Sequence, residues 1–176
     1  MRVCVFCGSS SGKSSVYLEQ AKDLGEKLVG NGHYLVYGGA SIGVMGKIAD
    51  TMLAKDGHVI GVMPKSLIDW EVGHQGLTEF IEVETMHTRK EKMYELSDCF
   101  VTYPGGFGTM DELFEITTWA QLQYHKKPIY LVNVNGYFDH LIKHMELSVA
   151  EGFVSKEHFE LITIVNSNEE LLERIN

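Results

Sequence analysis

The chain has 176 residues, 44% of them hydrophobic and 22% charged, which is enough apolar material for one folded domain and too much for a disordered or low-complexity chain. A formal net charge of −9 argues against nucleic acid as a partner, because a protein that neutralises backbone phosphates needs a basic surface. No segment approaches the roughly 18 uncharged apolar residues of a membrane-spanning helix, and the N-terminus lacks a signal-peptide pattern. We therefore expect a single cytoplasmic domain over residues 1–176 with no membrane partner.

Strands and helices alternate along the sequence. Short β-type runs are expected at 3–7, 33–37, 59–63, 80–83, 99–102, 128–133 and 161–165. Apolar residues at spacings of three and four predict helices near 17–28, 44–53, 89–96, 113–123 and 137–150 and at the C-terminus, whereas 65–79 is polar and irregular. This alternation is typical of parallel βαβ units. It predicts an α/β fold, a single doubly wound, Rossmann-like domain with a mostly parallel sheet.

Some cysteines and histidines have spacings that resemble metal sites. Cys4-x-x-Cys7 has no second pair to complete a zinc site, and it lies in an expected strand, whereas thiol-exchange cysteines lie at a helix N-terminus. We interpret these two cysteines and Cys99 as reduced thiols. His140 and His144 lack the glutamate of H-E-x-x-H, so we expect solvent-facing histidines and no metal.

Three glycine-rich turns follow expected strands, where α/β proteins bind anions. The first, Gly8 to Ser14, is one residue too short for a P-loop. It is either an ordinary tight turn or the hydroxyl-rich wall of a nucleotide site, with Ser9 and Ser10 facing the ligand. The second turn begins at Gly38 and Gly39 but has the wrong spacing for a dinucleotide fingerprint. Its glycines allow the backbone to approach either a ligand or a neighbouring helix.

The third turn, Pro104-Gly-Gly-Phe-Gly-Thr-Met-Asp-Glu112, has three glycines in four residues, which favours unusual backbone angles or close contact with a ligand. Thr109 and Glu112 have the spacing of a capping box, so Glu112 could simply cap the next helix. However, Glu112 shares a helix face with Ile116 and Trp119, which directs its carboxylate inward from the expected first helical turn.

Arg89, like Glu112, is a charged residue on an apolar helix face. It shares a helical stripe with Met86, Met93 and Leu96. An arginine on an apolar face needs a carboxylate or phosphate partner, because an unpaired buried charge is costly. Either a structural salt bridge or a polar pocket that also contains Glu112 would satisfy it.

Four motifs together resemble the Lonely Guy (LOG) family. They are Phe6-Cys-Gly-Ser-Ser10, the stretch from Tyr37 to Gly46, Met86…Arg89-Lys90, and the P-G-G-x-G-T-x-x-E sequence from Pro104 to Glu112. The resemblance extends over about residues 2–155 and includes Thr118-Trp-Ala-Gln-Leu122 and Asn133-x-x-Gly136-Tyr-Phe138. Family members are often labelled lysine decarboxylases, but nothing here marks a Schiff-base lysine with pyridoxal-phosphate partners.

The resemblance implies a homodimer that hydrolyses the N-glycosidic bond of cytokinin riboside 5′-monophosphates, which are N6-substituted AMP, without a cofactor. The products would be the free base and ribose 5-phosphate. Arg89 and Glu112 would be the catalytic pair. The implied substrate-binding residues are Gly105, Gly106, Phe107, Gly108, Thr109, Met110, Asp111, Lys90, Thr118 and Glu71.

Two positions depart from the family pattern, and they leave the base specificity open. Ala40 stands where members commonly have glycine, and Asp111 stands where they often have glutamate. Two alternative functions are a general AMP or purine-monophosphate nucleosidase and a non-catalytic nucleotide or cofactor carrier. Apolar residues around Trp119 and Leu122 predict a surface that a second copy of the chain partly buries.

Overall fold

A computed structural model describes residues 1–68 and 73–176. In these residues seven strands form one parallel sheet, in the order β4-β3-β2-β1-β5-β6-β7. The strands are β1 (Arg2–Phe6), β2 (Tyr34–Tyr37), β3 (Val59–Pro64), β4 (Glu79–Val83), β5 (Cys99–Thr102), β6 (Ile129–Val132) and β7 (Ile162–Val165). The prediction of a doubly wound α/β fold is confirmed, and the named strands are parallel throughout.

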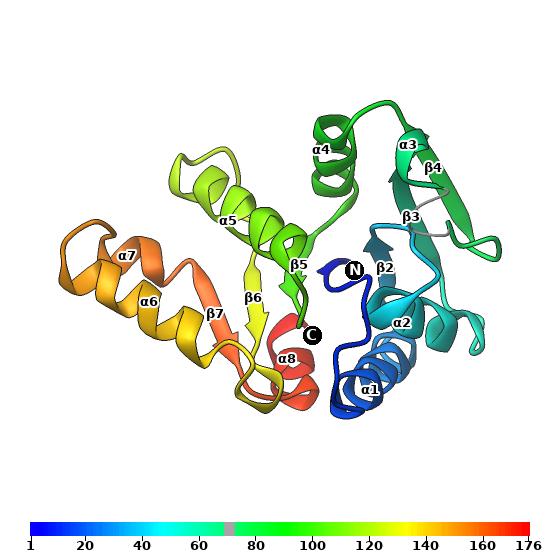
Figure 1. Ribbon diagram of the computed structural model, residues 1–176, viewed down its shortest axis with the longest axis horizontal. Helices are drawn as coiled ribbons and strands as arrows, with labels where there is room; N and C mark the ends of the chain where they lie inside the picture. The colour runs from blue at the N-terminus through cyan, green and yellow to red at the C-terminus, as the bar shows by residue number, and fades with distance from the viewer. Residues whose placement is uncertain (69–72) are drawn as a thin grey trace.

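Helices cover both faces of the sheet (Figure 1). One face packs against α1 (Val16–Gly30), α2 (Gly43–Leu53), α8 (Asn168–Ile175) and the short α3 (Lys65–Ile68). The other face packs against α4 (Met86–Leu96), α5 (Phe107–Gln121), α6 (Asp139–Ala150) and α7 (Lys156–Phe159). Within the described residues, no helix is long and apolar enough to span a membrane.

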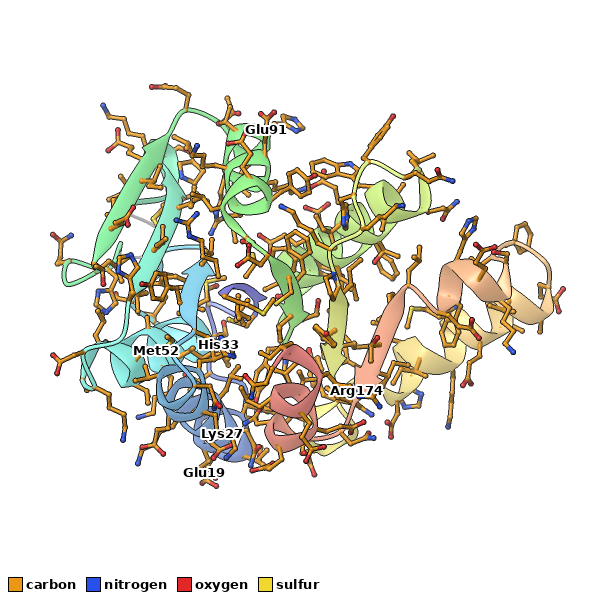
Figure 2. The ribbon with its side chains drawn as sticks, turned by 180° about the vertical axis from the view of Figure 1, so that it is seen from behind. Glu19, Lys27, His33, Met52, Glu91 and Arg174 are labelled. Atoms are coloured by element: carbon orange, nitrogen blue, oxygen red, sulfur yellow. The ribbon has the colours of Figure 1, made fainter. Side chains whose placement is uncertain are left out.

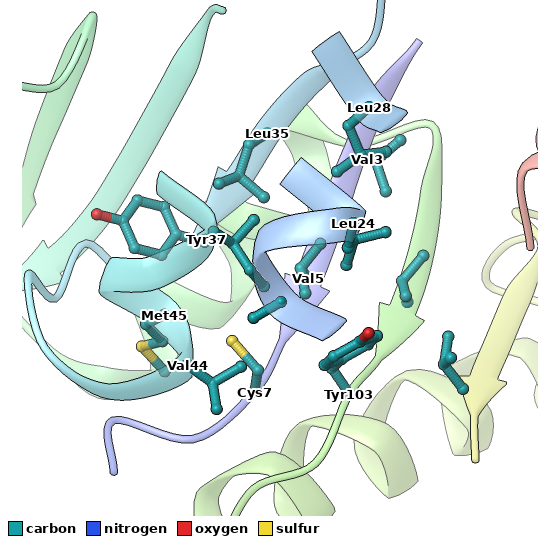
Figure 3. Packing of buried hydrophobic residues seen from close by; sticks show 14 of the residues in the cluster. Val3, Val5, Cys7, Leu24, Leu28, Leu35, Tyr37, Val44, Met45 and Tyr103 are labelled. Carbon is teal, nitrogen blue, oxygen red and sulfur yellow. The ribbon is translucent and has the colours of Figure 1, made fainter. Parts of the chain in front are cut away.

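The alternation of side chains along β1 divides the core into two clusters. Val3, Val5 and Cys7 join the cluster beneath α1 and α2, whereas Cys4 and Phe6 join the cluster beneath α4 and α5. A strand buried on both faces must be apolar at every position, which explains the uninterrupted run of apolar residues. Figure 3 shows how this first cluster extends to the end of β1, where Cys7 lies close to α2.

An ion-pair cluster joins the N-terminal and C-terminal parts of the chain. Lys27 of α1 bonds to Asp23 on the same helix and to Glu169 of α8, 2.8 Å away. The two helices lie beside each other (Figure 2). The sequence predicted a C-terminal helix but not this contact.

Three local features differ from the sequence prediction. The helix expected from Leu113 begins at Phe107, because the glycine-rich turn itself continues into the helix. The helix expected from Tyr137 begins at Asp139, after a short 3₁₀ turn, η1, at Val134–Gly136. Helices α3 and α7, each of four residues, were not predicted, because four residues are too few for a helical period to be recognised.

The strand order places a crevice between β1 and β5. The chain winds outward from β1 toward β4 in one direction and from β5 toward β7 in the other. Ligands of open α/β sheets bind beyond the carboxyl ends of the strands at such a reversal. Strand β1 leads into the Gly8 turn and β5 into the Pro104 turn, so the fold brings two of the three predicted turns together.

Candidate active site

The three glycine-rich turns are bonded to one another at this crevice. The Gly8 N–H donates to the Pro104 carbonyl at 3.1 Å, and the Gly8 carbonyl accepts from the Met45 N–H of α2 at 3.1 Å. A Cβ on Gly43, which has a φ of +66°, would lie 2.3 Å from the Ser9 carbonyl group. Gly43 is thus required both for its left-handed backbone and for the close contact with the first turn.

A cavity of about 280 Å³ opens where these turns meet. Arg89 and Glu112 both line it, so the structure brings the two predicted catalytic residues together. The α5 N-terminus contributes Gly106, Phe107, Gly108, Thr109 and Asp111, and the other two turns contribute Cys7, Gly8, Ser9 and Met45. Leu67 and Met86 complete its apolar part.

Arg89 is 4% exposed, and backbone carbonyls hold its guanidinium. Its Nε donates to the Val62 carbonyl of β3 at 3.0 Å, and its Nη2 donates to the Gly38 carbonyl at the end of β2 at 2.9 Å. A Cβ on Gly38 would lie 2.1 Å from Nη2. Gly38 therefore makes room for Arg89, a side chain of the neighbouring helix α4.

Glu112 is 8% exposed, so the prediction that its carboxylate is buried is confirmed. It lies in the second turn of α5, because the helix begins at Phe107, and the expected position in the first turn is wrong. The capping-box interpretation is also wrong, since Gly106 is the N-cap residue and Thr109 already lies within the helix. The negative charge of Glu112 adds to burial in raising the pKa of the Cys7 thiol.

The N-terminus of α5 has no side-chain cap from its N-cap residue. The N-cap residue Gly106 supplies no side-chain cap to the first-turn N–H groups, which therefore need another partner. A Cβ on Gly106 or Gly108 would meet nothing within 4 Å, whereas a Cβ on Gly105 would lie 2.1 Å from the Thr109 Oγ1. Packing within the described residues thus requires Gly105 but leaves open space above Gly106 and Gly108.

Lys90 and Asp111 bond to each other across α4 and α5. The Lys90 Nζ lies 2.7 Å from the Asp111 Oδ2 and 3.3 Å from the Glu115 Oε2. Burial lowers the pKa of Lys90, but the bonds and charges of the two carboxylates outweigh it and raise the pKa overall. The pair links the helix that carries Arg89 to the helix that carries Glu112.

The other predicted substrate-binding residues lie in different places. Gly105 and Ser10 line a neighbouring cavity of about 310 Å³, and Ser9 lines both cavities. Among the predicted residues that the structure describes, Gly38, Gly39, Lys90, Met110 and Thr118 line neither of these two cavities. The exposed Thr118 hydroxyl donates to the Phe114 carbonyl at 2.7 Å. Glu71 lies outside the described residues.

Sequence reasoning missed two tyrosines that line the neighbouring cavity, Tyr17 and Tyr137. Their rings pack edge to face with centroids 5.6 Å apart. The Tyr137 hydroxyl donates to the Gly105 carbonyl at 2.6 Å. The sequence places Tyr17 only at the start of the helix expected near 17–28, and apolar periodicity cannot indicate that a ring borders a cavity.

The cysteines are buried thiols and form no disulfide. Burial raises the pKa of all three, that of Cys99 to about 12. Because the thiolate is the nucleophilic form, the raised pKa values lower the reactivity of these thiols. His140 and His144 are exposed, as predicted.

Comparison with known proteins identifies relatives along almost the whole chain. Residues 45–175 match a family model described as possible lysine decarboxylase. A probable cytokinin riboside 5′-monophosphate phosphoribohydrolase of Oryza sativa subsp. japonica is 48% identical over 91% of this chain and 70% of its own. A cytokinin riboside 5′-monophosphate phosphoribohydrolase of Arabidopsis thaliana is 44% identical over 99% of this chain and 81% of its own.

The fold is also found among solved structures. The molybdenum cofactor binding protein of Rippkaea orientalis superposes with a TM-score of 0.74 over 99% of this chain and 94% of its own, at 21% sequence identity. At this identity the similarity establishes the fold alone.

Proposed function

The chain belongs to the LOG family of cytokinin riboside 5′-monophosphate phosphoribohydrolases, and from this membership we propose that it hydrolyses the N-glycosidic bond of an N6-substituted AMP. The products are the free base and ribose 5-phosphate. The observation that carries the assignment to this cavity is that a buried arginine and a buried glutamate line it together, beside a helix N-terminus without a side-chain cap.

The 5′-phosphate binds at the N-terminus of α5. The first-turn N–H groups and the helix dipole favour an anion, and the Thr109 hydroxyl is close by. The absence of side chains on Gly106 and Gly108 leaves room for the phosphate oxygens to approach the backbone. A phosphate held here places the ribose against Arg89 and Glu112, which line the same cavity.

Glu112 acts on the ribose during cleavage. Breaking an N-glycosidic bond leaves positive charge on the sugar ring, and a carboxylate stabilises that charge, binds ribose hydroxyls or accepts a proton from the attacking water. Burial strengthens each of these interactions, because the surrounding dielectric constant is low. Glu112 lies in the second turn of α5, the helix whose N-terminus forms the phosphate site, and so keeps a fixed position relative to that site.

Arg89 supplies a fixed positive charge opposite α5. Its bonds to Val62 and Gly38 anchor the guanidinium to β3 and to the residue that follows β2. An arginine held in this way binds a phosphate or orients a carboxylate without first losing side-chain entropy. Both roles fit the same reaction.

The chemistry of Lys90 does not favour decarboxylation of lysine, despite the description of the family model. A Schiff-base lysine reacts as the neutral amine, which is obtained by lowering its pKa. Asp111 and Glu115 raise the pKa of Lys90 instead. The lysine beside this site is therefore held in the charged form.

The chain forms a homodimer in the cytoplasm. Phe114, Leu122 and Tyr124, on α5 or just after it, are 41%, 53% and 70% exposed. A second copy that covers these side chains would remove their exposed apolar area from water. Light scattering during size exclusion tests this directly: a mass near twice the 19.8 kDa of one chain supports the dimer, and a mass near 19.8 kDa contradicts it.

The experiment that tests the activity is incubation with isopentenyl-AMP and with AMP separately, followed by chromatography of the released bases. Base released mainly from isopentenyl-AMP supports the proposed substrate class. Equal release from AMP points to a general purine-monophosphate nucleosidase. If neither substrate releases base at high protein concentration, the proposed hydrolase activity is contradicted. A carrier that binds the nucleotide without cleaving it then explains the site better.

A further inference from the structure

The segment from Asn133 to Phe138 forms a rigid turn beside the phosphate site. The Asn133 side chain accepts from the Phe138 N–H and donates to the Asp139 carboxylate, both at 2.8 Å. Asn135 and Gly136 have φ values of 52° and 70°, which asparagine and glycine tolerate better than other residues do. The motif Asn-x-x-Gly therefore specifies one backbone shape, and Tyr137 follows it directly.

Tyr137 is held in place on two sides. Its ring packs edge to face against the buried Phe138, with centroids 4.8 Å apart, and against Tyr17 of α1, with centroids 5.6 Å apart. The side chain nevertheless remains partly in solvent, since the residue is 43% exposed. A tyrosine fixed this firmly at the surface, with its hydroxyl 2.6 Å from the Gly105 carbonyl, does more than fill the core.

The bond to Gly105 fixes the first peptide group of the phosphate site. Because a trans peptide is planar, its carbonyl and its N–H point in opposite directions. Holding the Gly105 carbonyl toward Tyr137 therefore directs the Gly106 N–H away from Tyr137. Two adjacent glycines have little intrinsic resistance to rotation of the peptide between them, so an external restraint is what keeps this N–H in one orientation.

We propose that Tyr137 is a positioning residue that orients the Gly105–Gly106 peptide to bind the substrate 5′-phosphate. The inference rests on the proposed function, since it takes the α5 N-terminus as the phosphate site. It assigns a role to the Asn133-x-x-Gly136-Tyr137 motif, which builds the turn that presents the hydroxyl. Tyr137 touches the cradle backbone through its hydroxyl and acts on the phosphate only through that backbone.

Tyr137→Phe and the matched control Tyr17→Phe test the proposal. Each substitution removes one hydroxyl and keeps the ring packing. Only the Tyr137 hydroxyl bonds to the phosphate site, and the Tyr17 hydroxyl has no hydrogen bond within the described part of the chain. Circular dichroism and melting temperature verify that both variants fold.

The first readout is the affinity for ribose 5-phosphate, measured by isothermal titration calorimetry. We expect Tyr137→Phe to raise Kd by about fivefold to tenfold, the range of one lost hydrogen bond, and Tyr17→Phe to change it by less than about twofold. The second readout is kcat/KM for isopentenyl-AMP and for isopentenyladenosine. Tyr137→Phe should lower the value for the monophosphate by a similar factor and leave that for the nucleoside unchanged, because the nucleoside has no phosphate.

The two readouts separate failure of this proposal from failure of the proposed function. Tight binding of ribose 5-phosphate by the wild type without hydrolysis overturns the function, and the affinity of the two variants still decides the role of Tyr137. Unchanged affinity in Tyr137→Phe, or an equal loss in both variants, overturns the positioning role. Absence of ribose 5-phosphate binding in the wild type also overturns it, because there is then no phosphate site to orient.

Discussion

The Gly108→Ala variant tests whether Gly108 is required for ligand binding or for packing. A Cβ at Gly108 would meet nothing within 4 Å, and the residue lies in the first turn of α5 without a positive φ. Alanine should therefore fit, and because glycine in a helix is about 0.5–1 kcal/mol less favourable than alanine, stability should rise slightly. For a chain of this length that corresponds to an increase in melting temperature of about 1–4 °C.

The same methyl group should interfere with substrate, because it enters the space above the α5 N-terminus where the phosphate would lie. We expect kcat/KM for a nucleoside 5′-monophosphate to fall by at least about tenfold, or about 1.4 kcal/mol, with little change for the matching nucleoside. Gly105→Ala is the contrasting variant: its Cβ would lie 2.1 Å from the Thr109 Oγ1 and 2.7 Å from the Gly8 nitrogen, so it should lose stability first.

Thermal denaturation and steady-state kinetics on the same preparations measure both effects. A Gly108→Ala variant that is as stable as the wild type and equally active on the monophosphate would refute the location of the phosphate. A variant that loses several degrees of melting temperature would refute the claim that the space above Gly108 is free of packing.

Three further perturbations have defined outcomes. Glu112→Gln keeps the side-chain shape and removes the charge, so turnover should fall by roughly 10²-fold with little change in melting temperature; near-normal turnover would leave Glu112 without a catalytic role. Lys90→Met keeps the aliphatic stem but breaks the ion pairs with Asp111 and Glu115, and should lower kcat/KM several-fold. The loss of stability should be less than about 1 kcal/mol, since the Asp111 side chain is 60% exposed. Unfolding curves and kinetics on the same variant distinguish these effects. In the folded protein the pKa of Cys99 is raised to about 12 and that of Cys7 is also raised, so both thiols stay protonated at a pH where unfolded thiols, with a pKa near about 8.5, ionise. Ionisation therefore favours the unfolded state as pH rises above about 8.5, and the urea midpoint should fall between about pH 9 and pH 11. A constant urea midpoint over this range would contradict the prediction.

The two buried charges of the site were predictable from sequence because each interrupts an apolar pattern. Arg89 shares its helical stripe with Met93, and Glu112 shares its face with Ile116, so burial of each followed from helical geometry. Two of the hydrogen bonds of Arg89 did not follow from the sequence. Its guanidinium donates to the Val62 carbonyl in β3 and to the Gly38 carbonyl just after β2, and backbone carbonyls carry no side-chain signature.

The start of α5 was mispredicted because helix propensity penalises glycine. Gly106 and Gly108 indicated a loop, but the helix begins at Phe107, so Glu112 lies one turn deeper than expected. The role of Tyr137 depends on a hydrogen bond between residues 32 positions apart in sequence. A local pattern cannot indicate such a pair, because only the strand order brings the turn after β6 beside the turn after β5.

The central claim is that the enzyme cleaves the glycosidic bond of a nucleotide that it holds by the 5′-phosphate. The most direct test is kcat/KM for isopentenyl-AMP and isopentenyladenosine, with the products identified by chromatography. We predict free base and ribose 5-phosphate from the monophosphate, with an efficiency at least about 10²-fold above that for the nucleoside, or roughly 2.7 kcal/mol of transition-state stabilisation from the phosphate. Comparable efficiencies for the two substrates, or release of inorganic phosphate in place of base, would contradict the account.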